Sequence, residues 1–194
     1  MTSVSRSFFQ SDPLTCARAL VGCSLIWHGA GGIIVETEAY AEFGDEASHT
    51  FLRRGAQVFL NAKPAGTLYV YLNYGVHWLL NFLVRDGTVN GFVLVRALQP
   101  TQGVGLMQQR RRQNPLEALC SGPGKLTQAL AITAEFHGRD LYDLPEVSLT
   151  LPPHPPRIDV DRRIGISRAA EREWRFLLAD SPFVSVKKTR PRNV

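Results

Sequence analysis

The order of apolar, polar and turn-forming residues predicts a helix and then a β-hairpin in the first forty residues. Asp12 followed by Pro13 is typical of a helix start, because aspartate caps free N–H groups and proline suits the first helical turn. We therefore predict a helix over Pro13 to Val21, ended by Gly22. Two β-like runs that would form a hairpin follow at Cys23 to Trp27 and Gly32 to Tyr40.

Further β-like and helical runs continue to the end of the chain. Strands are expected at Thr67 to Asn73, Val76 to Val84, Gly91 to Ala97, Val147 to Leu151, Arg175 to Leu178 and Phe183 to Val186. Helices are expected at Gly103 to Arg112 and Gly124 to Ile132, and residues 41 to 65 are interpreted as irregular apart from a short helix at Asp45 to His49. This order predicts a single α+β domain over residues 1–194, with a curved, largely antiparallel sheet, flanking helices and a protruding hairpin.

The acidic run from Val35 to Tyr40 lies in the second predicted strand. Alternation along a strand predicts two faces: Glu36, Glu38 and Tyr40 on one, and Val35, Thr37 and Ala39 on the other. Neighbouring carboxylates on one face repel, so either both lie in solvent or one is kept for chemistry. The apolar residues that lead into the strand favour the second interpretation, in which a partly buried carboxylate activates water.

Four of the five tyrosines fall close together, at Tyr40, Tyr69, Tyr71 and Tyr74. Tyr69 and Tyr71 share a strand face, where core packing is the alternative to a binding role. Tyr74 is expected at the exposed tip of a hairpin, where a ring can wedge between base pairs. Aromatic rings beside carboxylates indicate chemistry on a nucleobase, because a ring stacks on a planar base.

The charge distribution indicates an anionic partner. Lys and Arg number 22 against 17 Asp and Glu, giving a net charge of +5. Acidic residues crowd positions 36 to 46, whereas basic residues cluster at 53–54, 110–112 and 187–192. Ser121, Gly122 and Lys125 surround a predicted helix start that could bind phosphate, or could simply begin a helix. Solvated faces, and a disordered tail at 187–194, are the alternatives for the basic clusters.

Several classes of protein are not indicated. Three cysteines without C-x-x-C spacing argue against disulfides and structural zinc, and the five histidines show no metal-binding spacing. No G-x-S-x-G or P-loop motif occurs. The first twelve residues and the apolar run at 78–84 are too polar or too short for a signal peptide or a membrane span. We expect a cytoplasmic protein with no membrane association.

Five blocks of sequence occur together in one order: VETEAY at 35–40, DEASH at 45–49, GTLYVYLNYG at 66–75, SGPGKLTQALAI at 121–132 and RIGI at 163–166. In these blocks the chain resembles the alkyladenine (3-methyladenine) DNA glycosylases, over about Phe8 to Val186. The resemblance implies an enzyme of base excision repair that needs no metal or organic cofactor. Its partner would be double-stranded DNA containing damaged purines, and we expect a monomer associated with the nucleoid in a bacterial cell.

The resemblance also implies roles for individual residues. Glu38 would be the general base and Arg96 would help to hold the attacking water. Tyr40, His49 and Tyr71 would stack on the flipped base, Asn81 would exclude normal guanine, and Tyr74 would fill the gap in the duplex. Ser121, Gly122 and Lys125 would contact the DNA backbone. Glu36 would support the site, Tyr69 would be structural, and the lack of a lysine at the nucleophile position implies hydrolysis without strand cleavage.

The chain differs from the family pattern at two places, and two other functions are alternatives. Residues 50–65 are shorter than the family's usual arginine- and proline-containing stretch, with Phe59-Leu60 replacing its Met-Phe pair, and Glu173 stands where a proline is common. The substrates, among 3-methyladenine, 7-methylguanine, hypoxanthine and ethenoadenine, are therefore left open. One alternative is a non-catalytic nucleic-acid binder that stacks bases on its tyrosines. A glycosidase using Glu36 and Glu38 is disfavoured, because carboxylates on one strand face leave no room for a sugar.

Overall fold

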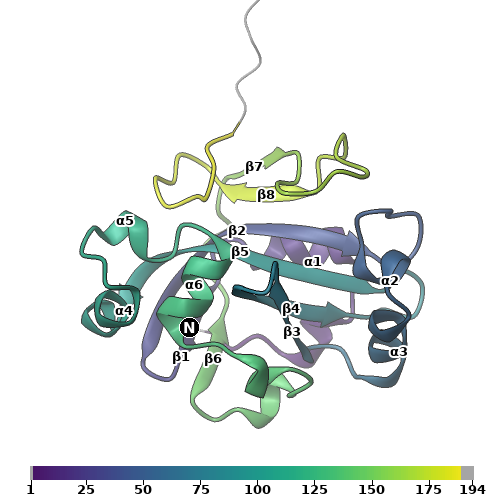
Figure 1. Ribbon diagram of the computed structural model, residues 1–194, viewed down its shortest axis with the longest axis horizontal. Coiled ribbons are helices and arrows are strands. Elements are labelled where there is room, and N and C mark those ends of the chain that lie inside the picture. The colour runs from purple at the N-terminus through teal and green to yellow at the C-terminus, as the bar shows by residue number, and fades with distance from the viewer. Residues whose placement is uncertain (1, 189–194) are drawn as a thin grey trace, which may run out of the picture.

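The long strand β2 (Ala30–Ala41) is the centre of the fold in the computed structural model, which describes residues 2–188. One edge of β2 pairs with β5 (Gly91–Gln102), and the other pairs first with β1 (Ser24–Trp27) and then with β8 (Arg175–Leu178). The acidic run therefore lies between two strands from distant parts of the chain (Figure 1). Side chains in such a position are shielded from water on both edges.

The remaining strands extend this sheet in the order β3-β4-β5-β2-β1-β6, with β7 paired to β8. Their bounds are β3 (Leu68–Asn73), β4 (His77–Val84), β6 (Val147–Thr150) and β7 (Ile158–Asp161). Every pairing of these strands within residues 2–188 is antiparallel. The expected α+β class and largely antiparallel sheet are confirmed.

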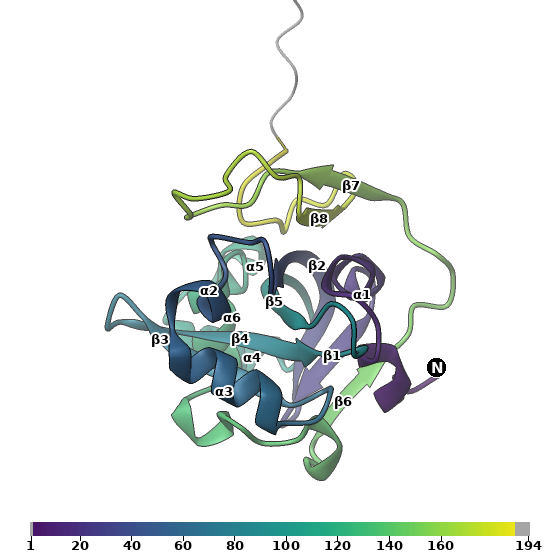
Figure 2. The same cartoon turned by 90° about the vertical axis from the view of Figure 1, so that its right-hand side faces the viewer.

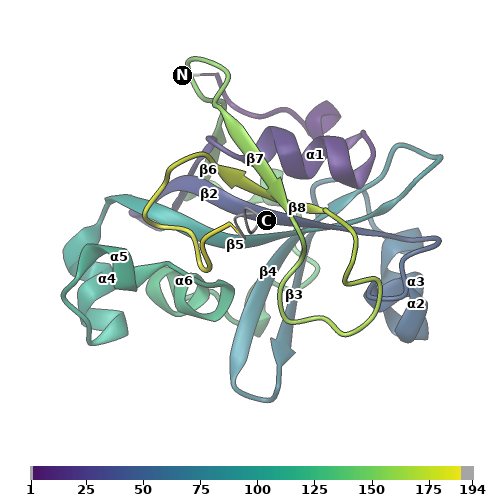
Figure 3. The ribbon, with the colours of Figure 1, turned by 90° about the horizontal axis from the view of Figure 1, so that it is seen from above.

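Helices flank the sheet on several sides (Figures 1 and 3). Their bounds are α1 (Pro13–Leu20), α2 (His49–Leu52), α3 (Arg54–Ala62), α4 (Val104–Arg111), α5 (Leu116–Leu119) and α6 (Pro123–Leu130), with short 3₁₀ turns η1 (Arg6–Phe9), η2 (Ala134–Phe136) and η3 (Leu141–Asp143). The cap predicted at Asp12 is present, because its side chain accepts hydrogen bonds from the N–H groups of Leu14 and Thr15, both at 3.0 Å. The main core lies between the sheet, α1 and α6.

The segment after β2 was wrongly expected to be irregular, since it contains α2 and α3. Ala56, Phe59 and Leu60 follow one face of α3 at helical spacing, which is the signal for this helix. They pack on Tyr69 and Phe92 to form a second, smaller core. The short elements α5 and β7 were not predicted either.

The pairing of β2 with β5 is irregular at three places, and two of these are β-bulges on either side of Glu36. Ile34 pairs with Leu98, Glu36 with Ala97 and Thr37 with Val95, so Val35 and Arg96 are the extra residues of the two strands. The strand that was expected to end near Arg96 runs on to Gln102. Bulges re-aim side chains and are frequent beside active sites.

The bulge at Val35 corrects the expected division of β2 into two faces. Val35 packs with Ala97 and Phe183 in a cluster of its own. Thr37, in contrast, donates a 2.7 Å hydrogen bond to the carbonyl of Ala17 in α1, and Ala39 belongs to the main core. Alternation places Val35 on the wrong face because the extra residue breaks the period of two.

The stretch Phe183 to Val186 was predicted to be a strand and is not one. Side chains hold it instead: Glu36 accepts hydrogen bonds from the N–H and hydroxyl of Ser185, and Arg175 donates to the carbonyl of Val186. An apolar run with β-like composition thus lacks a partner strand. Of the tail expected to be disordered, 187–194, residues 189–194 lie outside the described residues, and Lys188 donates to Asp159 at 3.2 Å.

The protruding hairpin is formed by β3 and β4, which extend away from the body of the sheet (Figures 2 and 3). Tyr74 at its tip has φ +50° and Gly75 has φ +69°, so the turn places two residues in the left-handed region. The Tyr74 side chain is 86% exposed, as expected for a hairpin tip.

Candidate active site

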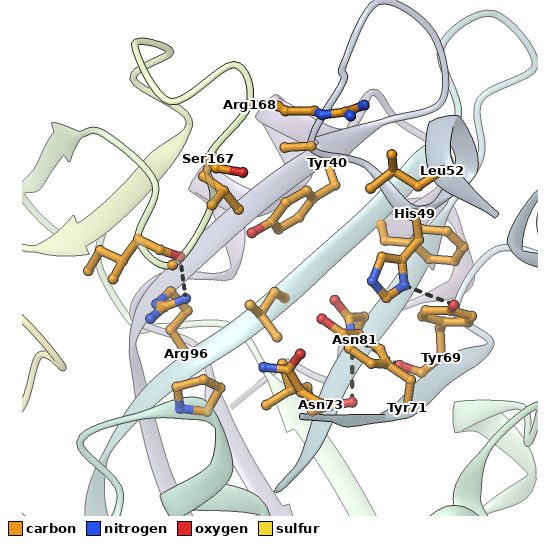
Figure 4. Close-up of a pocket in the computed structure, with 18 of the residues that line it drawn as sticks. Tyr40, His49, Leu52, Tyr69, Tyr71, Asn73, Asn81, Arg96, Ser167 and Arg168 are labelled. Atoms are coloured by element: carbon orange, nitrogen blue, oxygen red, sulfur yellow. Dashed lines mark hydrogen bonds between the residues drawn. The ribbon is translucent and has the colours of Figure 1, made fainter. Parts of the chain in front are cut away.

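A cavity of about 430 Å³ opens where the hairpin, the central strands, α2 and the segment 164–168 meet (Figure 4). This volume is in the range of small-molecule sites. Most of the residues predicted from the sequence line it: Tyr40, His49, Tyr71, Tyr74, Asn81 and Arg96. Further lining residues come from the cavity floor and rim: Tyr69, Phe92, Leu94, Pro123, Ile164 and Arg168.

Glu38 lies directly behind the wall of this cavity, and its side chain is fully buried. Its Oε2 accepts hydrogen bonds from the Tyr40 hydroxyl at 2.7 Å and from Nη1 of Arg96 at 3.1 Å. Its Oε1 accepts the backbone N–H of Ile164 at 2.7 Å. Tyr40, Arg96 and Ile164 all line the cavity, so the carboxylate is one layer of side chains away from it.

Arg96 projects from its bulge toward both carboxylates of β2. Nη1 donates to Glu38 and also to the carbonyl of Ile164 at 3.4 Å, while Nε lies 3.3 Å from Oε1 of Glu36. The interpretation that the two glutamates lie in solvent is excluded, because both are 0% exposed. Like charges this close in a dry site are stable only with a cation between them, and Arg96 supplies it.

Glu36 does not line the cavity and contacts the C-terminal part of the chain. It accepts a hydrogen bond from Nε of Arg175 at 2.7 Å, and Arg175 in turn donates to Asp161 at 3.2 Å. Charges therefore alternate along a buried row from Asp161 through Arg175, Glu36 and Arg96 to Glu38. Through these ion pairs, the position of Arg96 depends on residues of β7 and β8.

Burial shifts the pKa values of the groups in and behind the cavity. Burial raises the pKa of Glu38 above its usual range, with Arg96 as the main opposing influence. Burial, followed by the nearby Arg53, lowers the pKa of His49 to about 4, so this imidazole is neutral at pH 7. Burial also raises the pKa of Tyr71 to about 12 and that of Tyr40 well above 10. The titratable aromatic groups of the cavity wall named here are thus neutral at pH 7.

The aromatic groups on the hairpin side contact one another. The rings of His49 and Tyr71 are 4.3 Å apart, and Nδ1 of His49 is hydrogen-bonded to the Tyr69 hydroxyl at 3.1 Å. Tyr69, predicted to be structural, stacks on Phe92 at 4.4 Å and also lines the cavity. Asn81 donates its amide N–H to the carbonyl of Tyr69 at 3.0 Å, which fixes its orientation at the wall (Figure 4).

The helix start at Ser121, Gly122 and Lys125 lies beside the cavity, since Pro123 lines it. α6 begins after Gly122 without a capping side chain, and Lys125 donates to the Ser121 hydroxyl at 3.4 Å. Gly124 is packed so closely on His77 that an added Cβ would lie 2.7 Å from its ring. Two side chains of the basic cluster 110–112 form hydrogen bonds within the protein: Arg110 donates to the carbonyl of Ala129, and Arg111 donates to that of Leu119.

Sequence reasoning assigned no role to three residues that shape the site. Ile164 holds Glu38 through its backbone, and Arg163 forms a buried ion pair with Asp45 at 2.7 Å. The blocks RIGI and DEASH contained them, but no pattern within either block shows that the two blocks meet. A backbone donor carries no signal in the side-chain sequence.

Residues 2–188 contain neither a cluster of potential metal ligands nor a membrane-spanning helix. This part of the chain contains no group of three or more His, Cys, Asp or Glu arranged to hold a metal ion. None of its helices is long and apolar enough to cross a membrane.

Comparisons with known proteins identify the family of this chain. The profile of the family described as methylpurine-DNA glycosylase matches residues 7–182. A curated protein of Agrobacterium fabrum, named "Putative 3-methyladenine DNA glycosylase", is 49% identical over 184 residues, which is 95% of this chain and 93% of that protein. Proteins of the same name from Rhizobium etli and Nitrosospira multiformis are 48% and 43% identical, covering 93% and 91% of this chain and 87% and 91% of their own lengths. The chain therefore belongs to the methylpurine-DNA glycosylase family.

Proposed function

We propose that this protein is a monofunctional DNA glycosylase of base excision repair that hydrolyses the N-glycosylic bond of alkylated or deaminated purines in double-stranded DNA. Membership of the family and the names of the relatives support a 3-methyladenine or methylpurine DNA glycosylase. The proposed substrates are 3-methyladenine, 7-methylguanine, hypoxanthine and ethenoadenine. We propose further that residues 1–194 act as one catalytic domain, as a monomer, on chromosomal DNA in the cytoplasm.

The observation that carries this proposal is the position of Glu38 behind Tyr40 and Arg96. A water molecule admitted between Tyr40, Arg96 and Ile164, which separate Glu38 from the cavity, would contact the carboxylate and face the sugar carbon of a nucleotide whose base fills the cavity. Glu38 would accept the proton of the water as its oxygen attacks that carbon, while Arg96 and the carbonyl of Ile164 orient it. The electron pair of the breaking bond leaves with the base, and for an alkylpurine it neutralises the positive ring.

The composition of the cavity supports hydrolysis without strand cleavage. Strand cleavage by a glycosylase needs an amine that forms an imine with the sugar carbon, and no lysine is among the residues that line the cavity. Water is then the nucleophile. The product is an abasic sugar in an intact strand, together with the free base.

Stacking on the aromatic residues of the cavity wall can offset the free-energy cost of flipping a base. Flipping costs a few kcal/mol, and each stack of a base on an aromatic ring contributes about 1–3 kcal/mol. In this proposal Tyr40, His49 and Tyr71 stack on the base and Asn81 excludes the amino group of normal guanine. Tyr74, exposed at the hairpin tip, enters the gap left in the duplex.

The first turn of α6 is proposed to contact the DNA backbone. Its free N–H groups and Lys125 lie next to Pro123 at the edge of the cavity, where the phosphates of a flipped nucleotide would pass. Ser121 and Gly122 complete this contact.

Replacement of Glu38 by Gln tests the proposal directly. We expect release of the base from alkylated duplex DNA to fall by at least about 100-fold, while binding to that duplex persists. The control is Glu42→Gln, because Glu42 lies in the same segment but is hydrogen-bonded to Asn90 instead. Full activity of Glu38→Gln would overturn the assignment, and single-strand binding without any base release by the native protein would indicate the non-catalytic alternative.

A further inference from the structure

Arg163 places a buried positive charge against Tyr40, in a position that the mechanism above does not use. Its guanidinium carbon lies 4.7 Å from the centre of the Tyr40 ring and 5.0 Å from that of Trp174. The Arg163 side chain is 0% exposed and does not line the cavity. The guanidinium thus covers one face of Tyr40 and leaves the other face to the cavity.

Asp45 neutralises this charge. Nη1 and Nη2 of Arg163 each donate to one oxygen of Asp45, both at 2.7 Å, and the Asp45 side chain is also 0% exposed. Backbone groups complete the arrangement, since Arg163 donates to the carbonyl of Ala39 and Asp45 accepts the N–H groups of Ala41 and Ala47. The pair is therefore held in one geometry directly behind the stacking wall.

A charge on one face of an aromatic ring changes how strongly the opposite face attracts a cation. A tyrosine face attracts cations through its negative quadrupole. A guanidinium on the opposite face repels a second cation across the thickness of the ring, and water-free surroundings strengthen this repulsion. A purine with a fixed positive charge would meet that repulsion at Tyr40 unless a negative charge cancels it.

We propose that Asp45 is a positioning residue that determines specificity: by neutralising Arg163 it allows the Tyr40 wall to accept positively charged alkylpurines. This inference rests on the proposed function, because it concerns the base bound in the same cavity. The pair determines the preference for cationic over neutral bases, in addition to holding the wall in place. Arg172, which also lies over Trp174 at 4.7 Å, has a different carboxylate partner, Glu46.

A competition assay measures this preference. Duplexes carrying 7-methylguanine, whose ring is positively charged, and hypoxanthine, whose ring is neutral, are mixed in one reaction, and release of each base is followed above the enzyme-free background. The ratio of the two kcat/KM values does not depend on the folded fraction of a variant. We expect Asp45→Asn to lower the ratio of 7-methylguanine to hypoxanthine release by about tenfold or more.

The same competition assay is applied to the variant Arg163→Gln and to the double variant Asp45→Asn, Arg163→Gln. The single change leaves a negative charge behind Tyr40 and is expected to raise the ratio, whereas the double variant is neutral and should return it toward the native value. Glu42→Gln, which removes a charge from the same segment without touching Arg163, should leave the ratio unchanged. If Asp45→Asn does not fold, Arg163→Gln and the double variant still test whether the pair sets this ratio.

Three results separate the possibilities. An unchanged ratio in Asp45→Asn and Arg163→Gln, with both bases still released, would overturn the role of the pair and leave the proposed function intact. An equal fall in release of both bases would show that the pair is structural only, which also overturns the inference. Failure of the native protein to release either base would instead contradict the proposed function.

Discussion

The backbone N–H of Ile164 donates a 2.7 Å hydrogen bond to Oε1 of Glu38. The two residues are 126 positions apart in the chain. A buried carboxylate in a strand is thus held by a backbone group from the loop that connects β7 and β8. The position of Glu38 therefore depends on the fold of residues 163–168 as much as on β2.

Replacement of Ile164 by proline removes this donor, because proline has no N–H. A hydrogen bond to a charged group contributes about 1.5–3 kcal/mol, so we expect the single-turnover rate of base release to fall by about tenfold or more. Ile164→Val keeps the N–H and is the control. Equal rates in the two variants would show that Glu38 does not need this contact.

The variant Glu36→Gln tests the buried row of charges. Loss of this carboxylate leaves Arg175 without its 2.7 Å partner, and breaking a buried ion pair costs about 3–5 kcal/mol. Denaturant unfolding should show this loss, and single-turnover rates should fall because Arg96 loses its support at Nε. Glu117→Gln, on the exposed start of α5, should change neither quantity.

The rate of base release should fall at acid pH with the titration of Glu38. Water activation needs the deprotonated carboxylate, and burial raises the pKa of Glu38 above 4.5, so activity is lost as the pH falls through that raised pKa. His49, with a pKa lowered to about 4, stays neutral over this range. Single-turnover release of hypoxanthine gives the profile, and His49→Gln should not move its midpoint. A midpoint that follows His49 instead would contradict this assignment.

Replacement of Tyr74 by serine should weaken binding to damaged duplex DNA. The side chain is 86% exposed, so its loss leaves the core intact while removing the ring proposed to fill the gap in the duplex. Release from single-stranded substrates, which need no wedge, should be retained. Val76→Ser, two residues further along the hairpin and 69% exposed, is the matched control. Identical duplex affinity in the two variants would remove the wedge role.

Lys125→Gln should weaken DNA binding by a similar factor for every sequence and lesion. A lysine on a phosphate releases counterions, so the slope of log affinity against log salt should become shallower by about one. Lys125→Arg keeps the charge and should keep the slope. An unchanged slope in Lys125→Gln would place the phosphate contact elsewhere.

The sequence predicted the elements whose signals are local. The cap at Asp12, the turn at Tyr74 and the strand Arg175 to Leu178 occur where capping, turn and β-like residues placed them. The resemblance brought Tyr40, His49, Tyr71, Asn81 and Arg96 to one cavity, as the structure shows.

The sequence did not predict features that arise from pairing between distant segments. Alternation along β2 fails at Val35 because the bulge depends on the register with β5. The stretch at 183–186 has the composition of a strand, but side chains of Glu36 and Arg175 hold it instead. The helix α3 was missed although its apolar spacing was present, because the segment as a whole is polar and polar segments are typical of loops.

The buried acidic residues acquire their partners late in the chain. Glu36 pairs with Arg96 but also with Arg175, and Asp45 pairs with Arg163, so most of the chain has been synthesised before these two carboxylates have all their cationic partners. A buried carboxylate without a cation is strongly unfavourable, and Asp45 is therefore expected to stay in water until Arg163 is synthesised. Closure of the pocket is therefore a late step in biosynthesis, and a truncated product that lacks residues 163–175 would be unable to complete it.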